Sequence, residues 1–310
     1  MSAAVLLIGG TRFLGREITR AFTSRGHRVF VMNRGSREAS PEVAEAIRCD
    51  KTDRGAFSKV LRRQRWDVVV DTVLDAEDLE FVVETLGVEV GHFIHTGSMG
   101  VYGDARQIPA TENLPLAEYE GEYVVFNYKI QQDQVLLRAF QERGFPATIL
   151  RASYIYGPGC IPLDGWGGRA VEFFQMLRDE KTILLPDNGR ALLHPGHVRD
   201  LSRAFVHAAG RPESIGQVFN VGGSHALMMK DYVGRIAKAM GVEARLEFAP
   251  MPEVLARHPQ FTNERGMRFS GQHMCASIAK AEAQLGWRPE ISLDTGLREN
   301  IAWMREQGLL

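Results

Sequence analysis

The sequence predicts an α/β fold in which a doubly wound, parallel sheet of the Rossmann type is followed by a smaller α+β lobe near the C-terminus. Three observations predict it. Short apolar runs rich in Val, Ile and Phe alternate with helix-period segments through the first half of the 310 residues. A glycine-rich turn, residues 9–15, follows the first apolar run. From about Gly157 the sequence becomes richer in Gly and Pro, which indicates a second lobe.

Each predicted strand is a short apolar run, as expected where a strand is buried on both faces. The predicted strands cover residues 3–8, 28–32, 46–49, 67–71, 92–96 and 146–151. Leu14, Ile18 and Phe22 recur every four residues and predict a helix after the first strand. Further helices are predicted at residues 54–63, 77–86 and 123–142. Because strands alternate with helices, right-handed crossovers should give a parallel sheet.

The division of the chain follows from the same pattern. Residues 1–156 are predicted to form a dinucleotide-binding Rossmann domain, and residues near 197–222 are predicted to return to its sheet. Residues 157–310 are predicted to form mainly a substrate-binding lobe.

Composition argues against several classes of protein. The chain has 37 basic and 38 acidic residues and a formal net charge of −1, whereas nucleic-acid binders usually carry a clear basic excess. Cys49, Cys160 and Cys275 are far apart and predict reduced thiols in a cytoplasmic protein. No apolar run approaches the length of about 18 residues that is needed to span a bilayer. The apolar start ends at Gly9 without a basic segment, which favours a strand over a signal peptide.

The glycine-rich turn is the first candidate site. Glycine is needed where the backbone turns tightly and where it must approach a pyrophosphate, and the following helix offers free N–H groups to the phosphates. Gly9 would supply the turn, and Gly15 would let the helix pack on the sheet. The predicted dinucleotide contacts of this turn are Gly9, Thr11, Arg12, Phe13, Leu14 and Gly15.

This turn resembles the GxxGxxG turn of the extended short-chain dehydrogenase/reductases, with Arg12 in place of the middle glycine. The motif GGTRFLG is similar to that of an epimerase/dehydratase-like branch that includes the chloroplast stem-loop-binding proteins. Further stretches that resemble the family are residues 93–104, 151–159, 197–201, 220–222 and 285–289. The resemblance therefore covers nearly the whole chain and implies a bound nicotinamide dinucleotide.

The end of the second strand bears on the choice of coenzyme. An acidic residue there would bind the ribose diol of NAD, but this chain has Asn33, Arg34 and Arg37. Because a guanidinium pairs with a 2′-phosphate, NADP is favoured over NAD. The resemblance further implies that Asp50 meets the adenine and that the strand containing Tyr154 passes near the nicotinamide.

The resemblance also implies catalytic residues. Ser98 matches the active-site serine and Lys129 the lysine that holds the nicotinamide ribose, but the family tyrosine four residues before that lysine is replaced by Val125. Three interpretations stay open. Tyr123 or Tyr128 enters the site, although Tyr128 should lie about 100° around the helix from Lys129. Alternatively, an acidic group between residues 118 and 122, or another side chain, acts as the base. Finally, the protein binds a dinucleotide without ordinary hydride chemistry.

Substrate contacts are expected mainly from the second lobe. The candidates are Tyr102, Trp166, Arg190, Arg265 and Arg268, with Trp166 stacking on a base or a sugar. The histidines show no clean zinc-binding spacing, so no metal is expected.

Three functions follow from these residues. The first is an NAD(P)-dependent epimerase or dehydratase that transiently oxidises a hydroxyl of a nucleotide-sugar, nucleoside or related polyol. The second is an NADP-dependent carbonyl reductase. The third is a catalytically altered dinucleotide-binding protein with RNA or protein partners. Relatives commonly dimerise through two helices, so a homodimer is expected.

Overall fold

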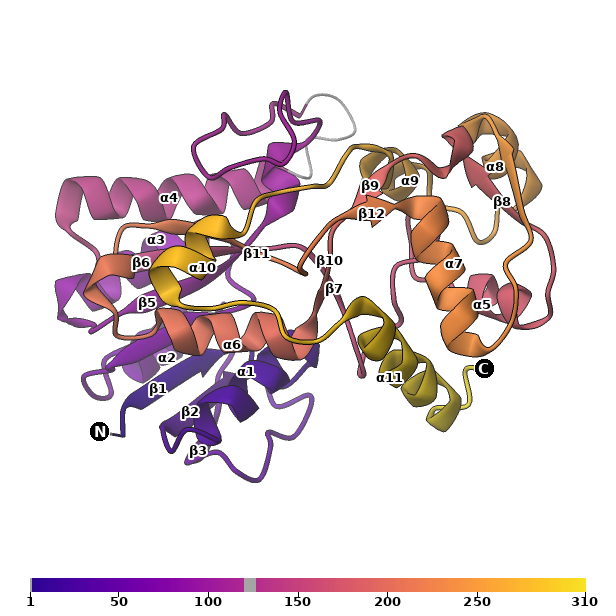
Figure 1. Ribbon diagram of the computed structural model, residues 1–310. Helices are drawn as coiled ribbons and strands as arrows, with labels where there is room; N and C mark the ends of the chain where they lie inside the picture. The colour runs from indigo at the N-terminus through magenta and orange to yellow at the C-terminus, as the bar shows by residue number, and fades with distance from the viewer. Residues whose placement is uncertain (1, 120–126) are drawn as a thin grey trace.

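The computed structural model describes residues 2–119 and 127–310. Its centre is a seven-stranded sheet in the order β11-β6-β5-β4-β1-β2-β3, and every neighbouring pair is parallel (Figure 1). The strands are β1 (Ala4–Ile8), β2 (Arg28–Asn33), β3 (Glu45–Arg48), β4 (Val68–Asp71), β5 (Phe93–Ser98), β6 (Ala147–Ala152) and β11 (Val218–Val221). The predicted Rossmann-type fold is confirmed. Strand order reverses between β1 and β4, the place where such sheets bind ligands.

Helices cover both faces of the sheet because its strands are apolar on both sides. Leu7 of β1 packs in one core with Ile18 and Phe205, whereas Leu6 packs in the opposite core with Phe57. The first face carries α1 (Phe13–Thr23), α6 (Val198–Ala208) and α10 (Ala279–Leu285). The other carries α2 (Arg54–Leu61), α3 (Ala76–Leu86) and α4 (Asn127–Arg143).

A second lobe has its own core and lies beside the sheet (Figure 1). Its helices are α5 (Val171–Arg178), α7 (Met229–Met240), α8 (Met251–Arg257), α9 (Glu264–Gly271) and α11 (Leu293–Glu306). Its strands form the pairs β8 (Ile183–Pro186) with β13 (Leu246–Ala249) and β9 (Leu192–Leu193) with β12 (Leu227–Met228). A further parallel pair, β7 (Tyr154–Tyr156) with β10 (Pro195–His197), lies between the lobes.

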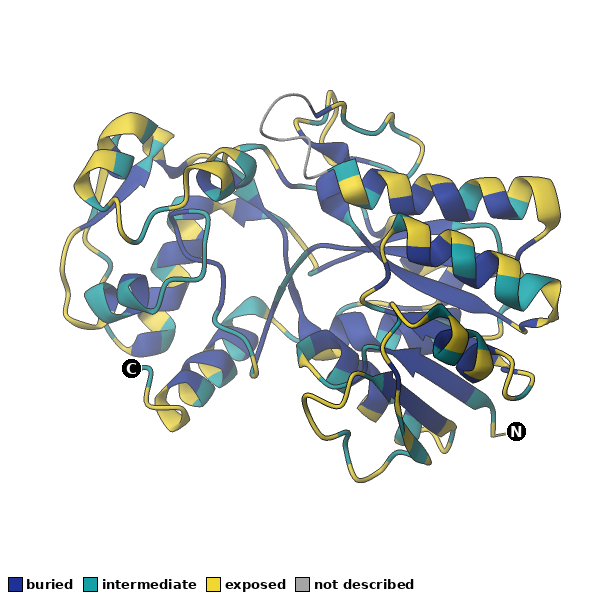
Figure 2. Cartoon of the chain, turned by 180° about the vertical axis from the view of Figure 1, so that it is seen from behind, coloured by how far each residue is buried: buried dark blue, intermediate teal, exposed yellow. Residues whose placement is uncertain are grey.

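Short 3₁₀ helices complete the fold, and the one that directly follows Ser98 shapes the site. They are η1 (Gly87–Glu89), η2 (Met99–Tyr102), η4 (Asp187–Gly189) and η5 (Pro212–Ser214). Seen from behind, the central strands are almost entirely buried (Figure 2).

The structure extends the predicted pattern in two places. Strand β11 pairs with β6 at one edge of the sheet, and α6 packs on α1. Helix α10 also returns to the first lobe, which the sequence pattern did not reveal. Its Ala281 and Leu285 are buried in the core beside α6, so hydrophobic burial holds this late segment against the sheet.

Candidate coenzyme and catalytic site

The glycine-rich turn is shaped by close backbone contacts. Gly9 has φ +96°, and a Cβ built there would lie 2.5 Å from the Thr72 hydroxyl oxygen. A Cβ at Gly15 would lie 2.3 Å from the Gly9 carbonyl oxygen. Both positions therefore require glycine, because a side chain would meet atoms that cannot move aside cheaply.

The first turn of α1 offers its N–H groups to an anion. Arg12 at the N-cap makes no capping hydrogen bond through its side chain, and no acidic residue lies in this first turn. Arg12 has φ −127°, an extended conformation open to any residue, so the backbone accommodates arginine where the family has glycine. The uncapped helix end and the tight turn below it fit the diphosphate of a dinucleotide.

The edge of the sheet beside this turn is basic. Arg34 and Arg37 are exposed, and the Asn33 side chain accepts a hydrogen bond from the Gly35 N–H at 2.6 Å. Arg48 joins them, since its Nε lies 2.8 Å from a Cβ built on Gly35. The sequence pattern missed Arg48. The parallel pairing of Asn33 with Arg48 brings it there.

Asp50 lies just after β3, as the prediction of an adenine contact requires. Its carboxylate accepts hydrogen bonds from the Thr52 N–H at 3.0 Å and the Thr52 hydroxyl at 2.9 Å. These bonds lower the pKa of Asp50. The side chain is exposed and carries a negative charge near the basic edge.

Ser98 and Lys129 both lie toward the carboxyl end of β5. Ser98 ends this strand, and its hydroxyl oxygen accepts a hydrogen bond from the Gly100 N–H at 3.1 Å. The Lys129 Nζ donates to the Thr96 carbonyl at 2.8 Å, two residues before Ser98. Burial lowers the pKa of Lys129, although Asp71 and Asp133 oppose this effect. The ammonium is therefore held close to the strand that ends in Ser98.

Tyr123 and Tyr128 were proposed as replacements for the missing catalytic tyrosine, and the structure describes only Tyr128. Tyr128 is 48% exposed, and the Lys129 Nζ lies 5.6 Å from the centre of its ring. Burial of part of this side chain raises the pKa of Tyr128. Tyr123, Val125 and most of the acidic segment lie outside the described residues, as does the predicted start of the helix at residue 123.

Behind Ser98 lies a buried polar cluster. The Arg151 Nε donates to Asp133 at 2.8 Å, and an Arg151 terminal nitrogen donates to the Tyr102 hydroxyl oxygen at 2.8 Å. The Tyr102 hydroxyl in turn donates to the Asn220 side-chain oxygen at 2.8 Å. Tyr102 was predicted to contact substrate, and the structure corrects this. The chain turns inward after Ser98, so the phenol is 5% exposed and holds two buried partners.

Trp166 was predicted to stack on a substrate, and the structure places its indole inside the second lobe. The Asp164 carboxylate accepts hydrogen bonds from the N–H groups of Trp166 and Gly168, both at 2.8 Å, and this folds the loop inward. The indole is fully buried against Phe173, and its N–H donates to the Leu184 carbonyl at 2.9 Å. It belongs to the core of the second lobe because its whole polar and apolar surface is already used.

The remaining substrate candidates lie on the second lobe. Arg190 is exposed beside a small cavity of about 140 Å³ that Met267 also lines. Arg268 pairs with Glu264 at 2.8 Å on α9, a helix that also contains Arg265. Tyr154 is half-buried in β7, between the lobes, and burial raises the pKa of its phenol.

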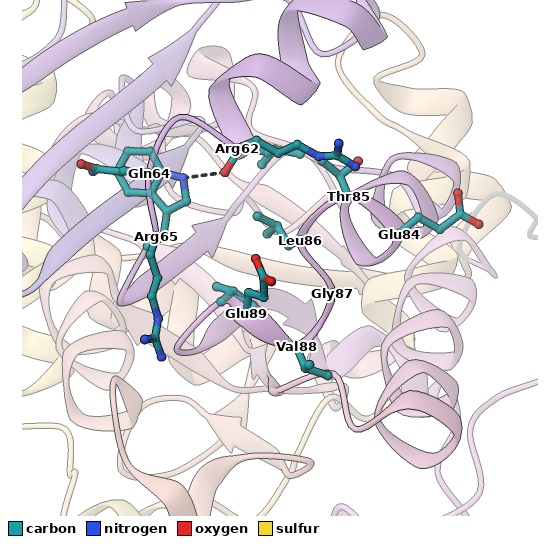
Figure 3. Close-up of a pocket in the computed structure, with 12 residues that line it drawn as sticks. Arg62, Gln64, Arg65, Glu84, Thr85, Leu86, Gly87, Val88 and Glu89 are labelled. Carbon is teal, nitrogen blue, oxygen red and sulfur yellow. Dashed lines mark hydrogen bonds between the residues drawn. The ribbon is translucent and has the colours of Figure 1, made fainter.

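A large cavity lies elsewhere. It has a volume of about 950 Å³ and is lined by residues 61, 62, 64–66 and 84–90, where α2 and α3 end (Figure 3). The Trp66 indole in its wall donates to the Leu61 carbonyl at 2.9 Å. Since β4 and β5 start just after these segments, the cavity lies at the amino ends of the strands. It is therefore at the edge opposite Ser98 and the glycine-rich turn.

Comparison with known proteins defines the family. The model of the NAD dependent epimerase/dehydratase family matches residues 5–222, which is most of the chain. The chain belongs to this family. As predicted, it is therefore an enzyme of the short-chain dehydrogenase/reductase type, and the family is NAD-dependent.

Two relatives illustrate the range within the epimerase/dehydratase family. The chloroplast stem-loop binding protein of 41 kDa b from Arabidopsis thaliana is 28% identical over 96% of this chain and 78% of its own length. The dTDP-L-rhamnose 4-epimerase of Burkholderia thailandensis is 23% identical over 98% of this chain and 95% of its own.

Solved structures show the same fold. The dTDP-glucose 4,6-dehydratase of Bacillus anthracis, solved in complex with NAD, superimposes with a TM-score of 0.77 at 16% identity and covers 100% of both chains. The UDP-glucose 4-epimerase of Thermotoga maritima, solved with UDP-glucose, gives a TM-score of 0.76 at 19% identity over 98% of this chain and 99% of its own. Among residues 2–119 and 127–310, no helix is long and apolar enough to cross a bilayer.

Proposed function

We propose that this protein is an NAD(P)-dependent epimerase or dehydratase that acts on a nucleotide-sugar, nucleoside or related polyol through transient oxidation of a hydroxyl. One observation carries the proposal. The uncapped start of α1, the glycine cradle below it, and the Ser98–Lys129 pair all lie at the carboxyl edge of one parallel sheet. A dinucleotide whose diphosphate lies on α1 would extend toward Ser98.

The bound coenzyme would take a hydride from the substrate carbon and later return it, which acidifies the neighbouring C–H bond. Ser98 would donate a hydrogen bond to the reacting oxygen, where negative charge develops. Lys129, held on the Thr96 carbonyl, would bind the ribose hydroxyls next to the nicotinamide. Sugar-nucleotide enzymes among the relatives support this substrate class.

The two lobes would bind different molecules. Residues 1–156, together with β10, α6 and β11 near residues 197–222, would hold the coenzyme, and the lobe formed mainly by residues 157–310 would hold the substrate. Helix α10 belongs to the coenzyme side by its packing. Association into homodimers remains a prediction.

NADP is the preferred coenzyme in this proposal because three arginines surround the end of β2. Replacing Arg34 with Ala should weaken binding of NADP⁺ about ten- to a hundredfold, since a hydrogen bond to a charged group contributes about 1.5–3 kcal/mol. Binding of NAD⁺ should change little. Calorimetry with each coenzyme measures both affinities.

The matched control is Arg65→Ala, because Arg65 is also exposed but lies at the opposite edge of the sheet. It should leave both affinities unchanged. Equal weakening of NAD⁺ and NADP⁺ in Arg34→Ala would contradict the preference, and no binding of either coenzyme to the wild type would overturn the proposed function.

Two alternatives remain distinguishable by experiment. A simple NADP-dependent carbonyl reductase is favoured by the same arginines, and it would consume NADPH without isomerising or dehydrating dTDP-glucose or UDP-glucose. A role in RNA binding is suggested by the stem-loop binding relative. It would appear as RNA affinity that falls steeply with salt, in the absence of coenzyme turnover.

A further inference from the structure

The proposed reaction needs a proton donor. Val125 stands where the family has its catalytic tyrosine, and the phenol of Tyr119 is placed to supply the proton instead. Tyr119 is 8% exposed, and its hydroxyl donates to the Gly100 carbonyl oxygen at 2.6 Å. The N–H of this same Gly100 donates to the Ser98 hydroxyl oxygen. A single glycine therefore separates the phenol from the serine.

Tyr119 is also tied to the helix that carries Lys129. The Asn127 side chain, at the first described residue of α4, donates to the Tyr119 carbonyl at 3.0 Å. The main chain of Tyr119 thus bonds to the start of α4, and its side chain bonds to the turn after β5. These are the two elements that position Lys129 and Ser98.

The surroundings of this phenol are apolar and come from both lobes. Its ring packs on the turn at Gly103, and the ring centre of Phe269 in α9 lies 6.5 Å away. A Cβ built on Gly100 would lie 2.7 Å from the Phe269 ring, so this ring also covers the Ser98 turn. An oxygen bound at Ser98 would be in a place with little water.

The other described phenols have different surroundings. Tyr102 is bound to Arg151 and Asn220, and Tyr156 and Tyr232 lie in the core of the second lobe. Tyr128 faces solvent. Tyr154 is near enough to Tyr119 that ionisation of one would raise the pKa of the other.

We propose that Tyr119 is the acid–base residue of this site and exchanges a proton with the substrate oxygen held by Ser98. This rests on the proposed function. As the carbonyl carbon gains a hydride, the π electron pair moves onto its oxygen, and the Tyr119 O–H bond breaks and gives its proton to that oxygen. The phenolate remains and is neutralised from solvent. In the oxidative direction the phenolate takes the hydroxyl proton, the O–H bonding pair forms the C=O bond, and the C–H bond breaks as its hydrogen leaves as a hydride for the oxidised coenzyme.

Burial supports this assignment because it keeps the phenol protonated. It raises the pKa of Tyr119 to about 12, so the free enzyme presents a donor at neutral pH. A positively charged nicotinamide nearby, together with Lys129, would stabilise the phenolate and bring the pKa down again. Coenzyme binding should therefore change the ionisation of this one side chain.

The test follows tyrosinate by ultraviolet absorbance during alkaline titration of the full chain, with and without NADP⁺ or NAD⁺. In the wild type, one phenol should titrate at a pH about 1 unit lower or more once the coenzyme is bound, as expected for a positive charge within several ångströms. Tyr119→Phe should remove this response while calorimetry shows the coenzyme still bound. The conservative replacement keeps the ring, and circular dichroism checks that each variant remains folded.

Tyr123→Phe, Tyr128→Phe and Tyr154→Phe are the matched variants and should keep the response. Fluorotyrosine at position 119 retains the phenol, lowers its intrinsic pKa and should move the responsive titration to lower pH. If coenzyme binds but Tyr119→Phe keeps the response, or another variant loses it, this inference is overturned and the proposed function stands. If no coenzyme binds, both are overturned.

Discussion

Buried ionisable side chains near Ser98 serve to position groups rather than to add stability. Asp133 and Arg151 are both almost fully buried, and their 2.8 Å bond joins α4 to β6. Burial raises the pKa of Asp133, although Arg151 opposes this. Because desolvation costs about as much as the attraction returns, such a pair specifies geometry more than it lowers the free energy of folding. Asp133 thereby orients the face of α4 that also carries Lys129.

His92 shows how a single residue couples stability to pH. Its Nδ1 accepts a hydrogen bond from the Gly210 N–H at 3.1 Å, and its Nε2 donates to the Thr148 hydroxyl at 2.8 Å. The ring is therefore neutral, with its proton on Nε2. Burial lowers the pKa of His92 to about 4, since a second proton would face the Gly210 N–H in an apolar site.

The free energy of unfolding should therefore fall as the pH is lowered from about 6.5 to about 4. In this pH range His92 is protonated in the unfolded chain but stays neutral in the folded chain. His92 alone should therefore lower the free energy of unfolding by about 3 kcal/mol. Urea unfolding at a series of pH values measures it. His92→Gln should flatten the slope, and the exposed control His225→Gln should not. An unchanged slope in His92→Gln would contradict this assignment.

Among the elements, two helices contain a glycine for opposite reasons. Gly15 in α1 is packed against the carbonyl of Gly9, whereas no atom lies within 4 Å of a Cβ built on Gly234 in α7. Glycine is thus required by packing in the first helix. In the second it only weakens the helix, because its unfolded backbone has more freedom to lose.

The same substitution should therefore have opposite effects in the two helices. Gly15→Ala should lower the free energy of unfolding by about 1–3 kcal/mol and weaken coenzyme binding, because the turn must open. Gly234→Ala should raise the free energy of unfolding by about 0.5–1 kcal/mol and leave binding unchanged. Denaturant unfolding and calorimetry measure both. If Gly15→Ala bound coenzyme normally, the glycine cradle would not be the diphosphate site.

At the scale of the whole molecule, the last helix ties the second lobe to the loop that leaves the first. Asn300 of α11 is fully buried. Its side chain accepts a hydrogen bond from the Gly157 N–H at 2.9 Å and donates to the Cys160 carbonyl at 3.0 Å. These contacts fix the chain immediately after β7, where it passes between the lobes.

Asn300→Ala should lower the free energy of unfolding by about 1–3 kcal/mol, because it leaves a buried N–H group and a buried carbonyl without partners. The exposed Asn113→Ala serves as the control and should have little effect. Urea unfolding followed by circular dichroism compares them. Equal stability of the two variants would show that this loop is held by other contacts.

Local patterns in the sequence determined the alternation of strands and helices, the glycine-rich turn, and the basic end of β2. Each of these features depends on residues that are close together in the sequence. Tertiary structure decided the rest. Arg48 joins Arg34 and Arg37 only through the pairing of β2 with β3, and α10 joins the sheet only through burial of Leu285. Trp166 turned inward because Asp164 folds its loop. Tyr119, the acid–base residue proposed above, is positioned by a hydrogen bond from its hydroxyl to the Gly100 carbonyl rather than by a helical repeat with Lys129.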